Sequence, residues 1–225
     1  MRMLEPLFKI KICGVTSVDG ARMIADSGAE AIGLNFYPES PRYVTLQHAE
    51  KIVTSAPQVL KKVGVFVNSS PDYVDETVNK LGLDAVQLHG DETIEMVAAL
   101  NSPSIIRAFR CHDGGLKEIE QALQAFHQSQ VELAGILLDA HVPGQYGGTG
   151  TMVDWNQIHA TEGRLFGIPL ILAGGLRFDN VGQAIATVRP AAVDTASGVE
   201  IEPGIKDASQ VSRFVEAARK AFQRQ

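Results

Sequence analysis

Short apolar runs alternate with longer amphipathic stretches from one end of the chain to the other. The apolar runs are rich in β-branched residues and mostly continuous, which is typical of parallel strands covered on both faces. They are 8–13, 31–36, 62–67, 85–89, 105–109, 135–139, 169–174 and 191–195. The hydrophobic pattern therefore predicts a parallel sheet of eight strands.

The segments between these runs have the spacing and the end signals of helices. Examples are SVDGARMIADSG, TLQHAEKIV, SPDYVDETVNKLG and FDNVGQAIATV. Ser70 followed by Pro71 is typical of an N-cap and a first helical residue, and Gly28 and Gly82 are typical of helix ends. A last helix is predicted over roughly 207–223.

Eight strands, each followed by a helix, take about 28 residues per unit in a chain of 225 residues, and a (β/α)8 TIM barrel typically needs about 250 residues in all. A doubly wound sheet uses the same alternation, but the count of eight favours the closed barrel. No shift in composition and no Pro/Ser-rich linker divides the chain. We therefore expect an α/β protein with a single (β/α)8 barrel domain over residues 1–225.

Composition and charge narrow the class of protein. Hydrophobic residues make up 45% of the chain and charged residues 20%, which excludes a disordered, collagen-like or coiled-coil chain. The net charge of −6 argues against nucleic acid as a partner, although a local phosphate pocket is compatible with it. The chain has no apolar run of about 18 residues and no signal-peptide pattern. We expect a cytoplasmic protein with no membrane partner.

The two cysteines, Cys13 and Cys111, are too few for a disulfide scaffold and lack the spacing of a zinc site, so no metal is expected. We expect Cys111 to be a small buried apolar side chain. Cys13 differs because it ends a strand and precedes a glycine. A thiol titrates near about 8.5 unless positive neighbours lower its pKa, so a nearby arginine or lysine would let Cys13 act as a thiolate base.

Other chemically capable residues also lie where the predicted strands end. Arg42 is in the loop after the second strand, His89 ends the fourth, Asp139 ends the sixth and Asp194 lies at the end of the eighth. In a barrel the active site is built at this end of the strands. The polarity of turns in general explains glycines there. It does not explain a thiol, an arginine, a histidine and two carboxylates at one rim.

Two neighbouring loops have the composition of a phosphate site. Gly174 and Gly175 follow the seventh strand, and Ser197 and Gly198 follow the eighth. Glycines allow backbone N–H groups to approach an anion, and the loops after strands seven and eight of a barrel often share this task. A tight turn is the alternative for one glycine pair, but two such loops favour phosphate. No P-loop or GxGxxG motif is present, so a nucleotide ligand is not expected.

The longest segment after any predicted strand is 140–151, AHVPGQYGGTGT, and it is rich in glycine. Such a segment is typical of a lid that shields a reaction from water, or of an ordinary surface loop. Its position directly after Asp139 favours the lid.

Seven motifs taken in order give a family resemblance. They are KICGVT (11–16), FYPESPRYV (36–44), GVFVN (64–68), VQLHGDE (86–92), LLDAHVPGQYGGTG (137–150), LAGGL (172–176) and VDTASGVE (193–200). Together they closely resemble the phosphoribosylanthranilate isomerase family, from about residue 9 to residue 207. The resemblance implies a reaction of tryptophan biosynthesis, the Amadori rearrangement of N-(5-phosphoribosyl)anthranilate to 1-(o-carboxyphenylamino)-1-deoxyribulose 5-phosphate, with no metal or organic cofactor.

The resemblance also implies roles for individual residues. The family's general base is the cysteine of KICG, here Cys13, and its general acid is the aspartate of LLD, here Asp139. Its ligand for the anthranilate carboxylate is the arginine that matches Arg42. His89 and Asp194 lie on matching motifs, and we expect them to shape the pocket or contact substrate hydroxyl groups. The expected partner is a small phosphorylated substrate, and the expected assembly is a monomer or a homodimer.

The chemistry explains these residue types independently of the family. Opening an aminofuranose ring needs an acid that protonates the ring oxygen, and a buried carboxyl group such as that of Asp139 can supply the proton. The Schiff base that forms is an electron sink, so a thiolate can remove the neighbouring C2 proton. An arginine holds a benzoate carboxylate through two parallel hydrogen bonds. Binding of the distant phosphate fixes the orientation of the substrate.

Two alternative functions stay open at this point. The isomerase of histidine biosynthesis performs the same rearrangement on a larger bis-phosphate, but proteins resembling it carry an aspartate where this chain has Cys13. A catalytically silent barrel that binds a sugar phosphate is the second alternative. The presence of Cys13, Asp139 and Arg42 together argues against it.

Overall fold

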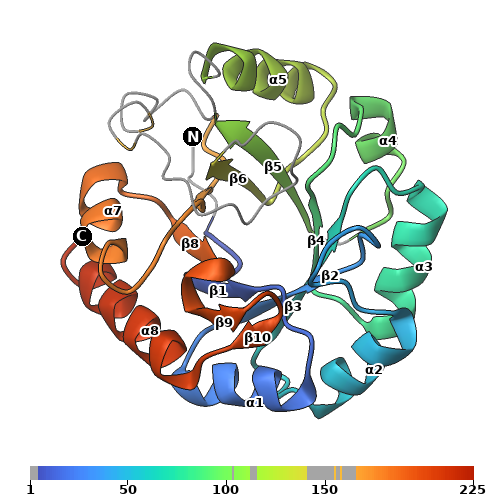
Figure 1. Ribbon diagram of the computed structural model, residues 1–225. Helices are drawn as coiled ribbons and strands as arrows, with labels where there is room; N and C mark the ends of the chain where they lie inside the picture. The colour runs from blue at the N-terminus through green and yellow to red at the C-terminus, as the bar shows by residue number, and fades with distance from the viewer. Residues whose placement is uncertain (1–4, 103, 112–115, 141–154, 156–157, 159–165) are drawn as a thin grey trace.

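The computed structural model describes residues 5–102, 104–111, 116–140, 155, 158 and 166–225. Its main strands are β1 (Ile10–Cys13), β2 (Ala31–Asn35), β3 (Lys61–Phe66), β4 (Ala85–Leu88), β5 (Ile105–Cys111), β6 (Gly135–Ala140), β7 (Leu170–Leu172) and β8 (Ala192–Thr195). All pair in parallel and in chain order, and β1 also pairs with β8, so the sheet closes on itself (Figure 1). This closed arrangement confirms the predicted (β/α)8 barrel and excludes the doubly wound sheet.

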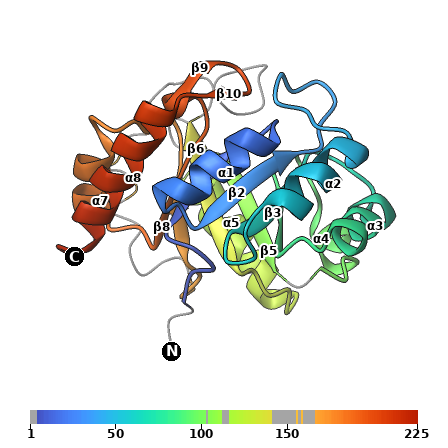
Figure 2. The same ribbon diagram turned by 90° about the horizontal axis from the view of Figure 1, so that it is seen from below.

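Helices surround the barrel and show the end signals that the sequence predicts (Figure 2). The Ser70 side chain accepts a hydrogen bond from the backbone N–H of Tyr73, and Gly28 and Gly82 end two helices with left-handed backbone, at φ 84° and 60°. The described helices are α1 (Val18–Ser27), α2 (Leu46–Ser55), α3 (Pro71–Leu81), α4 (Ile94–Ala98), α5 (Leu116–Gln128), α7 (Val181–Val188) and α8 (Ala208–Phe222).

The inward-facing positions of the barrel change from apolar to polar along the strands. Leu137 on β6 and Ala192 on β8 belong to a buried apolar cluster at the amino ends of the strands. Two residues further on, Asp139 and Asp194 line a pocket. Residues two apart on a strand share a face, so the same strands supply a packed floor and a polar rim. A larger apolar cluster includes residues of both the strands and the helices.

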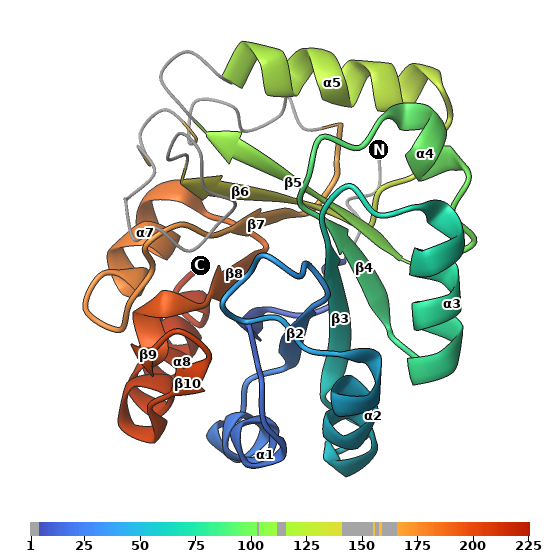
Figure 3. The same cartoon turned by 45° about the vertical axis from the view of Figure 1, so that its right-hand side comes forward.

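The chain after β8 contains a hairpin that the sequence did not predict. A single-turn 3-10 helix, η1 (Ser197–Val199), leads into an antiparallel hairpin of β9 (Glu200–Glu202) and β10 (Ile205–Lys206). Figure 3 shows this hairpin on the same side of the barrel as α8. The Thr16 hydroxyl donates to the Gly204 carbonyl at 2.6 Å, which attaches the hairpin to the loop after β1.

Candidate active site

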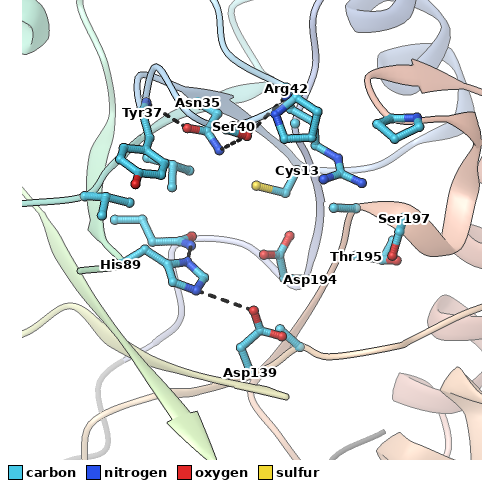
Figure 4. A pocket seen from close by; sticks show the side chains of 18 of the residues that line it. Cys13, Asn35, Tyr37, Ser40, Arg42, His89, Asp139, Asp194, Thr195 and Ser197 are labelled. Atoms are coloured by element: carbon cyan, nitrogen blue, oxygen red, sulfur yellow. Dashed lines mark hydrogen bonds and ion pairs between the residues drawn. The ribbon is translucent and has the colours of Figure 1, made fainter. Parts of the chain in front are cut away.

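The polar rim surrounds a pocket of about 440 Å³ at the carboxyl ends of the strands (Figure 4). Eight of the nine residues predicted for the site line it: Cys13, Arg42, His89, Asp139, Asp194, Gly174, Gly175 and Ser197. Gly198 does not line it. Segments that are far apart in sequence therefore meet at one cavity, as the barrel prediction requires.

Cys13 lies beside a buried lysine that the sequence analysis did not single out. Lys11 is fully buried two positions before Cys13, on the same strand face. Its ammonium group donates to Asp194 Oδ2 at 2.8 Å and also to the Cys13 sulfur. Gly33, directly across on β2, makes room for both, because a Cβ there would lie 2.6 Å from Cys13 Sγ and 3.2 Å from Lys11 Cε.

The charges around Cys13 act in opposite directions on its thiol. Burial raises the pKa of Cys13 above its ordinary value, and Lys11 is the main group that opposes this. Asp194 adds to the rise and Lys206 lowers it. Burial alone would lower the pKa of Lys11, but Asp194 and Cys13 raise it, so Lys11 is a cation at neutral pH. The thiol is thus buried next to the positive charge that a thiolate needs.

Arg42 is held by a carboxylate in the hairpin after β8. Its Nε donates to Glu200 Oε1 at 2.9 Å and its Nη2 donates to Oε2 at 2.6 Å. The same carboxylate accepts from Lys206 Nζ at 2.6 Å. Neither Glu200 nor Lys206 was predicted as part of the site. Glu200 closes the VDTASGVE motif, which was the available signal, but its partner Arg42 lies 158 positions earlier in the chain.

His89 and Asp139 form the opposite side of the pocket. His89 Nε2 lies 3.4 Å from Asp139 Oδ2, and the Gln87 side-chain nitrogen lies 3.0 Å from His89 Nδ1. If the Gln87 amide donates in this contact, Nδ1 accepts and the neutral imidazole carries its proton on Nε2, the nitrogen that faces Asp139. Asp139 is 7% exposed, as expected for the end of an apolar strand. His89 therefore contacts the predicted acid directly.

The loops after β7 and β8 come into contact at the backbone carbonyl of Leu176. Gly174 and Gly175 both have left-handed backbone, at φ 88° and 66°. Leu176 O accepts a hydrogen bond from the Thr195 hydroxyl at 2.7 Å, and a Cβ on Gly198 would lie only 1.9 Å from that oxygen. Gly198 thus allows the two loops to touch. Gly198 itself lies in the short 3-10 helix η1.

Several expectations fall on parts of the chain about which the structure says less. Most of the candidate lid, from 141 to 151, lies outside the described residues, and so does the side chain of Cys111. Among the described helices none is long and apolar enough to cross a membrane. Within the described ranges no group of three or more His, Cys, Asp or Glu side chains could hold a metal ion.

Comparison with known proteins gives matches over almost the whole chain. The family described as N-(5'-phosphoribosyl)anthranilate (PRA) isomerase matches residues 10–217. The N-(5'-phosphoribosyl)anthranilate isomerase of Myxococcus xanthus is 43% identical over 211 residues, covering 94% of this chain and 96% of that protein. The crystal structure of phosphoribosyl anthranilate isomerase from Thermotoga maritima has a TM-score of 0.84 at 37% identity, covering 95% of this chain and 99% of that one.

A second solved structure adds a ligand to the comparison. It is a phosphoribosyl anthranilate isomerase in complex with reduced 1-(o-carboxyphenylamino)-1-deoxyribulose 5-phosphate. Its TM-score is 0.81 at 35% identity, and the match covers 95% of this chain and 99% of that chain.

Proposed function

Since the chain belongs to the N-(5'-phosphoribosyl)anthranilate isomerase family, we propose how its pocket performs the reaction of that family. The protein is an isomerase of tryptophan biosynthesis that converts N-(5-phosphoribosyl)anthranilate to 1-(o-carboxyphenylamino)-1-deoxyribulose 5-phosphate. The rearrangement moves protons and double bonds within one molecule, so the residues needed are an acid, a base and groups that hold the two ends of the substrate.

Asp139 is the proposed acid and Cys13 the proposed base. Asp139 gives a proton to the ring oxygen, the C1–O bond breaks, and the nitrogen lone pair forms the C1=N bond of the Schiff base. The Cys13 thiolate then removes the C2 proton, and the electrons of the C–H bond move toward nitrogen to give an enolamine. Tautomerisation of the enolamine, in which the C2 hydroxyl loses its proton and C1 gains one, gives the ketone.

The observation that carries this assignment is the placement of three predicted residues around one cavity (Figure 4). In that view Arg42 and Asp139 lie at opposite ends of the pocket, and the Cys13 thiol points toward its middle. A substrate with its carboxylate on Arg42 then presents its sugar to the acid and the base.

His89 and Asp194 serve this chemistry from the sides of the pocket. His89 orients Asp139 through the Nε2 contact at 3.4 Å and is placed to return a proton to it. Asp194 is bound to Lys11 through Oδ2, while Oδ1 is buried and forms no hydrogen bond among the described residues. A buried oxygen without a partner is costly, and a substrate hydroxyl group would satisfy it.

The phosphate of the substrate is assigned to the loops after β7 and β8. Gly174, Gly175 and Ser197 line the pocket and would donate backbone N–H groups. Gly198 contributes by letting the two loops approach each other. The cytoplasmic location and the monomeric or homodimeric state stay predictions, the second of which light scattering on the purified protein tests.

Complementation of a tryptophan auxotroph that lacks the isomerase tests the function. The wild-type gene should restore growth without tryptophan, and a double variant with Cys13→Ser and Asp139→Asn should not, although both proteins accumulate. Failure of the wild-type gene, with folded protein present in the cells, would contradict the function. Assay of the purified enzyme on the bis-phosphate of histidine biosynthesis tests the alternative reaction. We expect no activity, because this chain has Cys13 at the position where proteins resembling that isomerase carry an aspartate.

A further inference from the structure

Glu200 is a strongly bound acidic side chain that the mechanism above does not use. Its side chain is 3% exposed and lies between two cations, Arg42 and Lys206. Burial would raise the pKa of Glu200, but hydrogen bonds and charge from Arg42 and Lys206 hold it below its ordinary value, so it is charged at neutral pH. The carboxylate also accepts from the backbone N–H of Gly204 at 3.2 Å.

Lys206 ties this group to the strand that carries the proposed base. Its ammonium donates to the backbone carbonyls of Cys13 at 2.5 Å and Ala196 at 3.2 Å, in addition to Glu200. These partners come from the end of β1, the end of β8 and the hairpin itself. Glu200 is therefore fixed relative to the barrel before any substrate binds. Its hydrogen bonds to Arg42 fix the guanidinium in turn.

The contact with Glu200 determines which part of the Arg42 guanidinium is available to a ligand. Nε and one N–H of Nη2 point to the Glu200 oxygens. A guanidinium has five N–H donors in one plane, so the two of Nη1 and the second of Nη2 are left. Two of these lie on the edge between Nη1 and Nη2, which has the geometry for a bidentate carboxylate.

We propose that Glu200 is a positioning residue that fixes the Arg42 guanidinium so that this edge faces the pocket and selects substrates that carry an aromatic carboxylate. The inference rests on the proposed role of Arg42 and goes beyond it, since it assigns the selectivity to a residue that does not touch the substrate. Lys206 strengthens the effect. Without the negative charge of Glu200, the Lys206 ammonium would be an unneutralised cation close to Arg42 and would repel the guanidinium.

The test uses two ligands and one matched control. The probes are reduced 1-(o-carboxyphenylamino)-1-deoxyribulose 5-phosphate and its phenylamino counterpart, which lacks only the carboxylate. Calorimetry gives the Kd of each for wild type, Glu200→Gln and Glu202→Gln. Glu202 is on the same hairpin but exposed, so its replacement controls for loss of one negative charge at that place. Steady-state kinetics on the substrate give KM and kcat for the same proteins.

In Glu200→Gln the Kd of the carboxylated probe should rise about tenfold, the effect of losing one charge-assisted hydrogen bond. The KM should rise similarly, while kcat and the Kd of the phenylamino probe stay close to wild type. Glu202→Gln should behave as wild type with both probes. If Glu200→Gln does not fold, Glu200→Asp keeps the charge but is one methylene short of the present contact, and its loss should again be confined to the carboxylated probe.

Three results would overturn the proposal. Equal losses for both probes mean that Glu200 only maintains the shape of the pocket. Unchanged or tighter binding of the carboxylated probe means that Glu200 merely neutralises Arg42. The third is an Arg42→Lys variant that binds both probes as wild type does. That result would show that Arg42 does not bind the carboxylate. A loss in Arg42→Lys without one in Glu200→Gln contradicts only the present inference.

Discussion

The two sides of the pocket are held together in different ways. The side around Cys13, formed by Lys11, Asp194, Arg42, Glu200 and Lys206, contains three ion pairs at 2.6 to 2.8 Å, all with largely buried partners. We call it the charged side.

The side around Asp139 consists of Gln87, His89 and Asp139, and its ion-pair contact is the longer one of 3.4 Å. We call it the acid side.

This difference matches what each side has to do. A buried thiol needs fixed positive charge to become a base. Burial raises the pKa of Cys13, and the charges of Lys11 and Lys206 oppose that rise. A group that gives away a proton and takes it back changes its charge within each turnover, so a strong fixed partner would trap it in one state. The charged side is therefore preorganised, whereas the contact between His89 and Asp139 on the acid side is longer.

The largest effect is expected when the acid side loses its proton donor. Asp139→Asn keeps the shape of the side chain but removes the transferable proton, so kcat should fall by at least about a hundredfold, the usual contribution of a positioned acid. Binding of the reduced product analogue should change little, because the proton transfer takes place only in the transition state. Steady-state kinetics and calorimetry check both values. A kcat close to wild type would show that the ring opens without Asp139.

Removing the cation of the charged side tests its preorganisation. Lys11→Met leaves Asp194 buried without its partner, and breaking a buried pair typically costs about 3–5 kcal/mol of unfolding free energy, measured by urea denaturation at pH 7. Lys11 has a raised pKa in the folded state, so its contribution is fully present at neutral pH and is lost only as the pH rises through that raised value.

Lys11→Met should also change the pH dependence of thiolate formation at Cys13. Lys11 lowers the pKa of the thiol, so its removal should raise that pKa and move the acidic limb of kcat/KM to higher pH. The rate of alkylation by iodoacetamide against pH, in a Cys111→Ser background, reports the thiolate directly. Alkylation profiles that coincide with and without Lys11 would mean that the charged side does not act on Cys13.

A smaller effect is expected at the junction of the two phosphate loops. A Cβ on Gly198 would lie 1.9 Å from Leu176 O, so Gly198→Ala should force the loops apart and destabilise the protein by about 1–3 kcal/mol. The affinity of the Gly198→Ala variant for inorganic phosphate should also fall. Gly182 is the control, since a Cβ there has no neighbour within 4 Å among the described residues and the position lies in α7. Gly182→Ala should be neutral or slightly stabilising. Equal phosphate binding in both variants would argue against the assignment of this site.

The sequence predicted the barrel because the strands are continuous apolar runs and the turns carry local signals such as Ser70 and Gly82. It also predicted which strand ends supply Cys13, Asp139 and Asp194. The ion pairs were not predictable, since Lys11 lies 183 positions from Asp194 and Arg42 lies 158 positions from Glu200.

A charged residue inside an apolar strand, two positions before Cys13, was the one available sign of Lys11. The hairpin of β9 and β10 was missed because its strands have three and two residues, too short for a periodic pattern.

The central claim is that Cys13 is the base, and the kcat of Cys13→Ser against that of Cys111→Ser tests it most directly. A serine hydroxyl has nearly the shape of the thiol but does not ionise in this pH range, so the Cys13 variant should lose at least about two orders of magnitude in kcat. The Cys111 variant should keep the wild-type value. A Cys13→Ser enzyme that is folded and turns over at a rate near that of wild type would contradict the assignment of the base.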